Sequence, residues 1–205
     1  KGHGGIYSDL AAVNRRDWEK QVSEEICLLS GEYEKLFVIG HSTGAMLAVR
    51  CTTGSTAAAG VVSISTPVFI VDKALYDWGL DRRIRDLSRI FPYIRTNSGS
   101  FFYHYQGRKI SRSLYARMSV SGINQIMLLS KETLKGISSF DRPILMIHAR
   151  DDKTADFRGT ELMFEQIGAS GKEKFLTEKG NHMLILNDGR DAVFEKIAEF
   201  ISRVK

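Results

Sequence analysis

The 205-residue sequence predicts an α/β protein whose mostly parallel sheet is covered by helices on both faces. Short apolar runs rich in β-branched residues alternate along the chain with segments whose apolar residues recur at helical spacing. One of these runs meets one of these helices at a glycine-bounded turn, residues 40–44. The alternation stops between residues 68 and 139, which predicts an insertion into an otherwise regular fold.

The N-terminal part supplies one helix, followed by two strands that flank a second helix. The first helix is predicted over residues 17–29, where four apolar side chains fall on one face: Trp18, Val22, Ile26 and Leu29. A strand at 36–39 leads into the glycine-bounded turn, and the apolar residues 45–49 predict the helix that leaves it. The short apolar run at 60–65 predicts a buried strand.

The stretch from residue 68 to residue 139 differs in composition from the rest of the chain. It holds ten of the twenty aromatic residues, and twelve Lys and Arg against five Asp and Glu, a net charge of +7 within a chain of net charge +5. We interpret it as an inserted, mainly helical cap between the core segments 1–67 and 140–205. Its arginine cluster, Arg82, Arg83, Arg85 and Arg89, is either a solvated face or a surface that attracts an anion.

Regular alternation returns after residue 142. The apolar run 144–149 predicts a buried strand, and a helix is expected around residues 162–167. A short strand at 174–176 and a C-terminal helix at 191–204 complete the pattern. Because strands that alternate with helices form parallel sheets, both halves of the core are expected to share one sheet.

Composition argues against several classes of protein. The chain has no nucleic-acid-binding signature, no apolar run of the roughly 20 residues that span a membrane, and no signal-peptide pattern. Its five histidines are dispersed, so no metal site is predicted. Cys27 and Cys51 lie in helical apolar patterns and are expected to be buried free thiols, which favours a cytoplasmic protein.

The turn at 40–44 has the spacing Gly-x-Ser-x-Gly: Gly40, His41, Ser42, Thr43 and Gly44. A serine at the apex of a sharp strand-to-helix turn has an exposed Oγ, and close neighbours that lack side chains relieve the crowding there. The N–H of Thr43 would point toward a developing oxyanion. His41 is expected to orient or pack rather than act as a base, since adjacent residues on a sharp turn point apart.

A serine nucleophile needs a histidine base and a carboxylate that orients this base, and both candidates lie downstream. Asp151 and Asp152 follow the strand 144–149, and His182 follows the next short strand. Functional groups collect at the carboxyl ends of parallel strands, so Ser42, Asp152 and His182 are predicted to meet there. The alternative for Asp152 is a helix cap, and the alternative for His182 is a structural loop histidine.

These residues resemble the α/β-hydrolase superfamily, and within it the carboxylesterase and monoacylglycerol lipase group. Residues 40–44 resemble its nucleophile elbow, 1–4 its Gly-His-Gly loop, 143–152 its strand that ends at the acid, and 180–182 its Gly-His loop with one residue interposed. The resemblance implies that Asp152 is the acid and Asp151 its neighbour. The family's N-terminal strands, which supply a second oxyanion N–H, have no counterpart in the sequence and are expected to be absent.

We therefore expect a serine hydrolase that cleaves carboxylic esters of small or medium acyl chains through an acyl-enzyme, without a cofactor. A thioesterase or acyltransferase would use the same triad, with the basic cap binding a phosphate-bearing thioester. A hydrolase fold that serves only as a binding protein is the other alternative. The expected partner is a small-molecule ester or thioester, and the sequence leaves the oligomeric state open.

Overall fold

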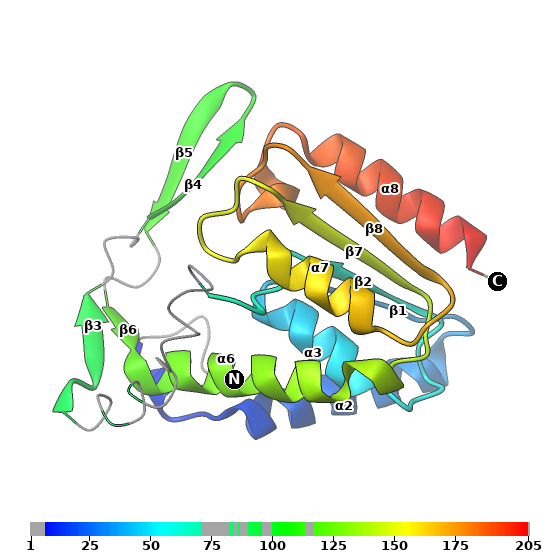
Figure 1. Cartoon of the computed structure of the whole chain (residues 1–205), viewed down its shortest axis with the longest axis horizontal. Coiled ribbons are helices and arrows are strands. Elements are labelled where there is room, and N and C mark those ends of the chain that lie inside the picture. The colour runs from blue at the N-terminus through cyan, green and yellow to red at the C-terminus, as the bar shows by residue number, and fades with distance from the viewer. Residues whose placement is uncertain are drawn as a thin grey trace.

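A computed structural model describes residues 7–70, 83, 86, 90–95, 100–113 and 117–204. The Gly-His-Gly loop at 1–4, and all of the arginine cluster except residue 83, lie outside the described residues. At the centre is a four-stranded parallel sheet in the order β1-β2-β7-β8 (Figure 1). Its strands are β1 (Phe37–His41), β2 (Gly60–Ile64), β7 (Ile144–Ala149) and β8 (Lys172–Thr177). All four strands predicted from the sequence are present, and the predicted parallel pairing is confirmed.

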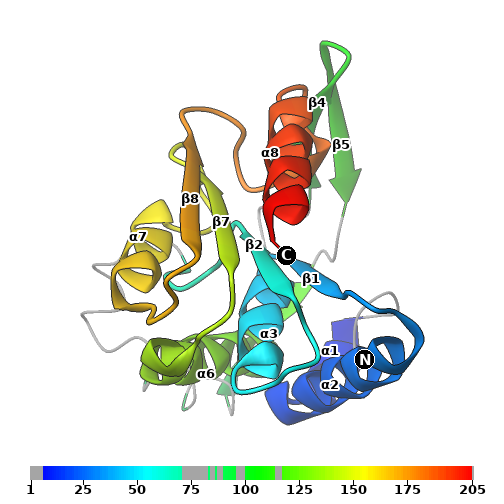
Figure 2. The same cartoon turned by 90° about the vertical axis from the view of Figure 1, so that its right-hand side faces the viewer.

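Helices cover both faces of this sheet, as predicted. On one face, α3 (Thr43–Thr52) and α7 (Phe157–Gln166) bury an apolar cluster that includes Val49, Val61, Met146 and Met163. On the other face, α8 (Arg190–Arg203) buries a second cluster that includes Val62, Leu145, Ile147 and Phe200 (Figure 2). Successive residues of β7 alternate between the two clusters, because side chains along a strand point to opposite faces. This double burial explains why every residue of 144–149 except His148 is apolar.

Three more helices form an outer layer on the α3 side. These are α1 (Tyr7–Ala11), α2 (Arg15–Glu32) and α6 (Val120–Gly136), and a third apolar cluster joins α1, α2 and α6 to α3 through Leu10, Trp18, Met46, Leu47 and Leu129. Asn14 begins α2 with a capping box in which its side chain accepts from the helix backbone and Asp17 reaches back. The helix predicted over residues 17–29 is therefore longer at both ends. Its Cys27 is exposed, so the expectation that this thiol is buried was wrong.

The described part of residues 68–139 contains strands that were not expected from the sequence. Two antiparallel pairs occur, β3 (Tyr93–Arg95) with β6 (Arg117–Ser119), and β4 (Ser100–Tyr105) with β5 (Arg108–Ser113). The β4–β5 turn has two residues of positive φ, Gln106 at 52° and Gly107 at 69°, a geometry that suits a tight hairpin. Figure 1 shows this hairpin extending from the body near the start of α8.

Candidate active site

The turn between β1 and α3 has the strained geometry that the Gly-x-Ser-x-Gly spacing predicts. Ser42 has φ 56° and ψ −127°, and it precedes the first residue of α3, Thr43. Its N–H donates to the carbonyl of Ile64 at 2.9 Å, which fixes the turn to the end of β2. The Thr43 N–H is at the start of the helix, where backbone N–H groups lack intrahelical partners and favour negative charge.

The two glycines of the turn are not equivalent. A methyl group at Gly40 would lie 2.7 Å from the Ala45 Cα and closer still to the Gly44 carbonyl, so only glycine fits there. A methyl group at Gly44 would meet nothing within 4 Å. The expectation that both positions must lack a side chain therefore holds for Gly40 and is wrong for Gly44.

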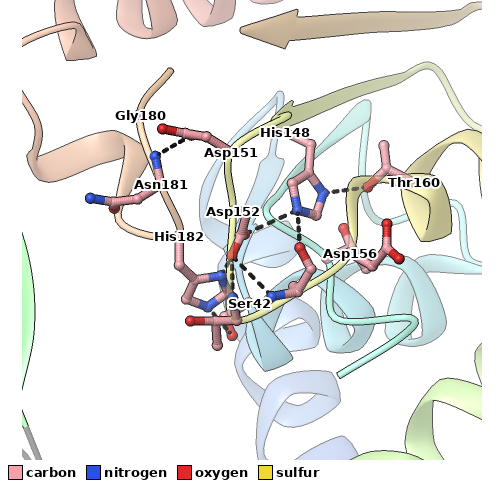
Figure 3. A network of polar contacts seen from close by, with 12 residues as sticks. Ser42, His148, Asp151, Asp152, Asp156, Thr160, Gly180, Asn181 and His182 are labelled. Atoms are coloured by element: carbon pink, nitrogen blue, oxygen red, sulfur yellow. Dashed lines mark hydrogen bonds and ion pairs between the residues drawn. The ribbon is translucent and has the colours of Figure 1, made fainter. Parts of the chain in front are cut away.

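Three side chains from three different loops form a continuous chain of hydrogen bonds at the carboxyl ends of the strands (Figure 3). The Ser42 Oγ lies 2.9 Å from the Nε2 of His182, and the Nδ1 of His182 lies 2.8 Å from the Oδ2 of Asp152. Asp152 follows β7 and His182 follows β8, so β1, β7 and β8 each contribute one member. The geometry is that of a nucleophile, a base and a carboxylate that orients the base.

The carboxylate of Asp152 is fully buried and surrounded by donors. Its Oδ1 accepts from the backbone N–H groups of Thr154 at 2.7 Å and Ala155 at 2.9 Å, while its Oδ2 accepts from His182 and lies 3.1 Å from the Nε2 of His148. Burial by itself would raise the pKa of Asp152. The hydrogen bonds from His148 and His182, the charge of His182 and the Ala155 N–H more than offset this effect and hold the pKa well below its usual range. Asp152 is therefore a permanent anion at neutral pH.

The loop that carries His182 is fixed by two polar side chains. Asp151 Oδ1 accepts from the Asn181 N–H at 2.8 Å, and the Asn187 amide donates to the Gly180 carbonyl and, at 3.0 Å, to the Met183 carbonyl. Asn181, the residue interposed between glycine and histidine, has φ 48°, a left-handed conformation that asparagine tolerates. The insertion is thus accommodated in the backbone without displacing His182.

His41 supports the same loop from the elbow. Its Nε2 is 2.8 Å from the His182 carbonyl oxygen, and the two imidazole rings lie 5.1 Å apart between centroids. A carbonyl only accepts, so Nε2 carries the proton of His41. The side chain contacts the histidine loop and not the Ser42 Oγ, in keeping with the expectation that it orients or packs.

Residues 16–189 match the family described as serine aminopeptidase S33. The chain belongs to this family. It is a carboxylesterase-like α/β-hydrolase, as the motifs of the sequence predicted, and the S33 match spans β1, β2, β7 and β8 together with the residues that form the hydrogen-bonded chain.

Two curated proteins show what this S33-family chain is similar to. It is 22% identical over 203 residues to a thermostable monoacylglycerol lipase of Bacillus sp. (strain H-257), an alignment that covers 99% of this chain and 77% of the relative. It is 19% identical to a carboxylesterase of Bacillus subtilis (strain 168), covering 100% of this chain and 79% of the relative.

Solved structures show the same fold. A structure from work on LipS and LipT, two metagenome-derived lipolytic enzymes, superimposes with a TM-score of 0.84 at 20% identity, covering 98% of this chain and 79% of that one. The monoacylglycerol lipase of Paleococcus ferrophilus superimposes with a TM-score of 0.73 at 17% identity, covering 93% and 76%. No helix in the described part of this S33-family chain is both long and apolar enough to cross a membrane.

Sequence motifs predicted the three residues that the structure brings together, but not their surroundings. Asp151 was expected only as a neighbour of the acid, whereas the structure shows it bonded to the histidine loop. No role was predicted for His148 or Asn187, both of which are buried within hydrogen-bond distance of site residues or their loops. The available signal for His148 was its position four residues before Asp152, across the end of a strand. That spacing is too common in sequences to indicate a contact between the two side chains by itself.

Proposed function

We propose that the chain hydrolyses carboxylic esters of small or medium acyl chains, with Ser42 as nucleophile, His182 as general base and acid, and Asp152 as the residue that orients His182. The observation that carries this proposal is the pair of hydrogen bonds that join the three side chains, 2.9 Å from Ser42 to His182 and 2.8 Å from His182 to Asp152.

The proposed reaction runs through an acyl-enzyme. The Ser42 Oγ attacks the ester carbonyl carbon while its proton passes to the His182 Nε2, and the resulting oxyanion accepts a hydrogen bond from the Thr43 N–H. His182 then gives the proton to the departing alkoxide, which leaves as the alcohol. Water, deprotonated by the same Nε2, attacks the acyl carbon, and collapse of the second tetrahedral intermediate releases the acid and the Ser42 hydroxyl.

The proposed substrate class follows from the family and the relatives. A monoacylglycerol lipase and a carboxylesterase are among the proteins that this chain resembles over almost its whole length. Both names describe cleavage of a carboxylic ester, and Ser42 rather than a carboxylate at the elbow fits acyl transfer. We also propose that residues 68–139 form the cap of the acyl site, with α6 as the part of the cap that packs on the core.

A fluorophosphonate probe tests the proposal directly, because it reacts only with a serine that a base activates. We expect stoichiometric labelling at Ser42 by peptide mapping, hydrolysis of p-nitrophenyl butyrate, and loss of both in the Ser42→Ala variant. A residual rate some 10³- to 10⁴-fold above water is compatible with that loss, since binding and oxyanion contacts survive. Full esterase activity in Ser42→Ala, or a folded protein that neither labels nor turns over, would contradict it.

A further inference from the structure

A second histidine, His148, lies within hydrogen-bond distance of the Asp152 oxygen that also accepts from His182. His148, the fifth residue of β7, is completely buried, and its Nε2 lies 3.1 Å from Asp152 Oδ2 and 3.1 Å from the Ala155 carbonyl. Its Nδ1 lies 2.7 Å from the hydroxyl of Thr160, itself buried in α7. Figure 3 shows the line of side chains from Thr160 through His148 and Asp152 to His182.

The neighbours of His148 determine which of its nitrogens carries a proton. Both groups that face Nε2, an ionised carboxylate and a backbone carbonyl, are acceptors only, so Nε2 must be protonated. Nδ1 faces a hydroxyl, which can donate to a neutral ring or accept from a charged one. In either state Nε2–H donates to Asp152, and the ring has no freedom to turn away because both of its edges are bonded.

We propose that His148 is a positioning residue of the catalytic site: its Nε2–H holds Asp152 Oδ2 at the angle from which that oxygen accepts from His182 Nδ1. The inference rests on the proposed function of Ser42, His182 and Asp152. Asp152 Oδ1 is already fixed by two backbone N–H groups, so His148 supplies the third fixed donor and leaves one direction of the carboxylate to the catalytic base.

His148 also affects the charge of His182, because its Nε2–H donates to the Asp152 carboxylate whose negative charge stabilises the His182 imidazolium. Two backbone N–H groups still hold Oδ1 when His148 is replaced, so Asp152 stays beside His182. The donor lost from Oδ2 then leaves more of the carboxylate charge to interact with His182, which favours the protonated base. The other charged or titratable groups around His148 are His41 at the elbow and Asp156 at the start of α7, and Arg158 pairs with the Asp156 carboxylate. Variants that leave these groups in place therefore isolate the effect of His148.

Two substitutions separate positioning from packing. His148→Leu removes the donor, whereas His148→Gln keeps an N–H near the place of Nε2 without an ionisable ring. For His148→Leu we expect kcat/KM on p-nitrophenyl butyrate to fall between about 10-fold and about 10²-fold, the range for a misplaced catalytic group. The acid limb of its kcat/KM profile is expected to move to higher pH. His148→Gln should bring kcat/KM back to within about threefold of the wild-type value. Its acid limb should return to the wild-type midpoint.

Thr52→Val is the matched control. Thr52 is as buried as His148 and donates to the Ala48 carbonyl, but it lies at the end of α3 far from Ser42, so its loss should lower the melting temperature and leave the profile unchanged. A His148→Leu enzyme with wild-type kcat/KM, or one that loses rate with an unmoved acid limb and without rescue by glutamine, would overturn the inference. If His148→Leu does not fold, Thr160→Val, which frees the other edge of the ring, takes its place with the same expected direction.

A measurement that needs no turnover keeps the two proposals apart. If the wild-type protein hydrolyses no ester, or Ser42→Ala hydrolyses it as well as wild type, the proposed function fails. The ¹⁵N NMR titration of His182 still tests His148 in that case. A titration midpoint of His182 that moves to higher pH in His148→Leu and returns in His148→Gln supports the inference, and an unmoved midpoint overturns it.

Discussion

At the scale of the residue, His41 ties the stability of the fold to pH. Burial lowers the pKa of His41 below its ordinary value of 6.5, although its hydrogen bond to the His182 carbonyl opposes the shift. In the unfolded chain the same ring takes up a proton near pH 6.5. As the pH falls below this value, the unfolded state therefore binds more protons than the folded state, and the free energy of unfolding decreases.

His41→Gln should remove this pH dependence while keeping an N–H that can reach the His182 carbonyl. We expect urea unfolding at pH 8 and pH 5.5 to show a smaller loss of unfolding free energy for the variant than for the wild type, by up to about 1 kcal/mol. Above pH 7 the unfolding free energies of the two proteins should depend on pH to the same extent, because His41 is mostly neutral there in the folded and in the unfolded state. An equal or larger loss in His41→Gln would show that His41 is not the group responsible.

At the scale of the element, the strand-turn-helix unit depends on one glycine and not on its partner. Gly40→Ala places a methyl group against the Gly44 carbonyl and the Ala45 Cα, both backbone atoms that cannot move aside. We expect it to lower the free energy of unfolding by about 3 kcal/mol or more and to abolish fluorophosphonate labelling. The measurement is chemical denaturation together with probe labelling of the folded fraction.

Gly44→Ala is the matched control for that prediction, with the same added atom four residues along the same turn. The new methyl group meets open space, and alanine in the first turn of α3 favours the helix by up to about 1 kcal/mol. We expect an unchanged or higher melting temperature and retained labelling. Equal damage from the two substitutions would mean that the crowding at Gly40 is not what makes the turn sensitive.

At the scale of the whole molecule, predictability followed burial. The strand at 144–149 was predicted to its observed bounds because both of its faces are covered, which makes all of its residues except His148 apolar. The candidate site residues could be named because strand ends and chain order constrain them. The β3–β6 pair was missed since its two strands are separated by more than twenty residues of sequence. The β4–β5 hairpin was missed because its turn, Gln106-Gly107, lacks the Asn-Gly or Asp-Gly signal of a two-residue turn. His148 was missed because its contacts form only when β7, α7 and the loop after β7 come together.

The same distinction divides residues 68–139, part of which is core and part of which is proposed cap. Leu129 of α6 is completely buried in the cluster with Met46 and Trp18, and Ile126 and Leu134 of the same helix pack against the apolar clusters. The β4–β5 hairpin contacts the segment that precedes α8: the exposed Gly107 N–H donates to Asp188 Oδ2 at 3.3 Å, and β4 also lies close to residues 184–186. Because Arg95 and Arg117 are paired across β3 and β6, a short turn between them can replace the hairpin.

We expect a variant in which residues 96–116 are replaced by Asn-Gly, a favoured two-residue hairpin turn, to fold with a melting temperature within about 4 °C of the wild type. Leu129→Ala, a core substitution in the same insertion, should instead lower the free energy of unfolding by about 2 to 5 kcal/mol. The test compares kcat/KM for p-nitrophenyl octanoate with kcat/KM for p-nitrophenyl acetate. If the hairpin belongs to the cap of the acyl site, its removal changes the ratio of these two values by more than about threefold, the scale of one or two methylene contacts. An unchanged ratio in a stable variant would place the hairpin outside the acyl site, because a segment that contacts the acyl chain cannot be removed without altering how chain length is discriminated.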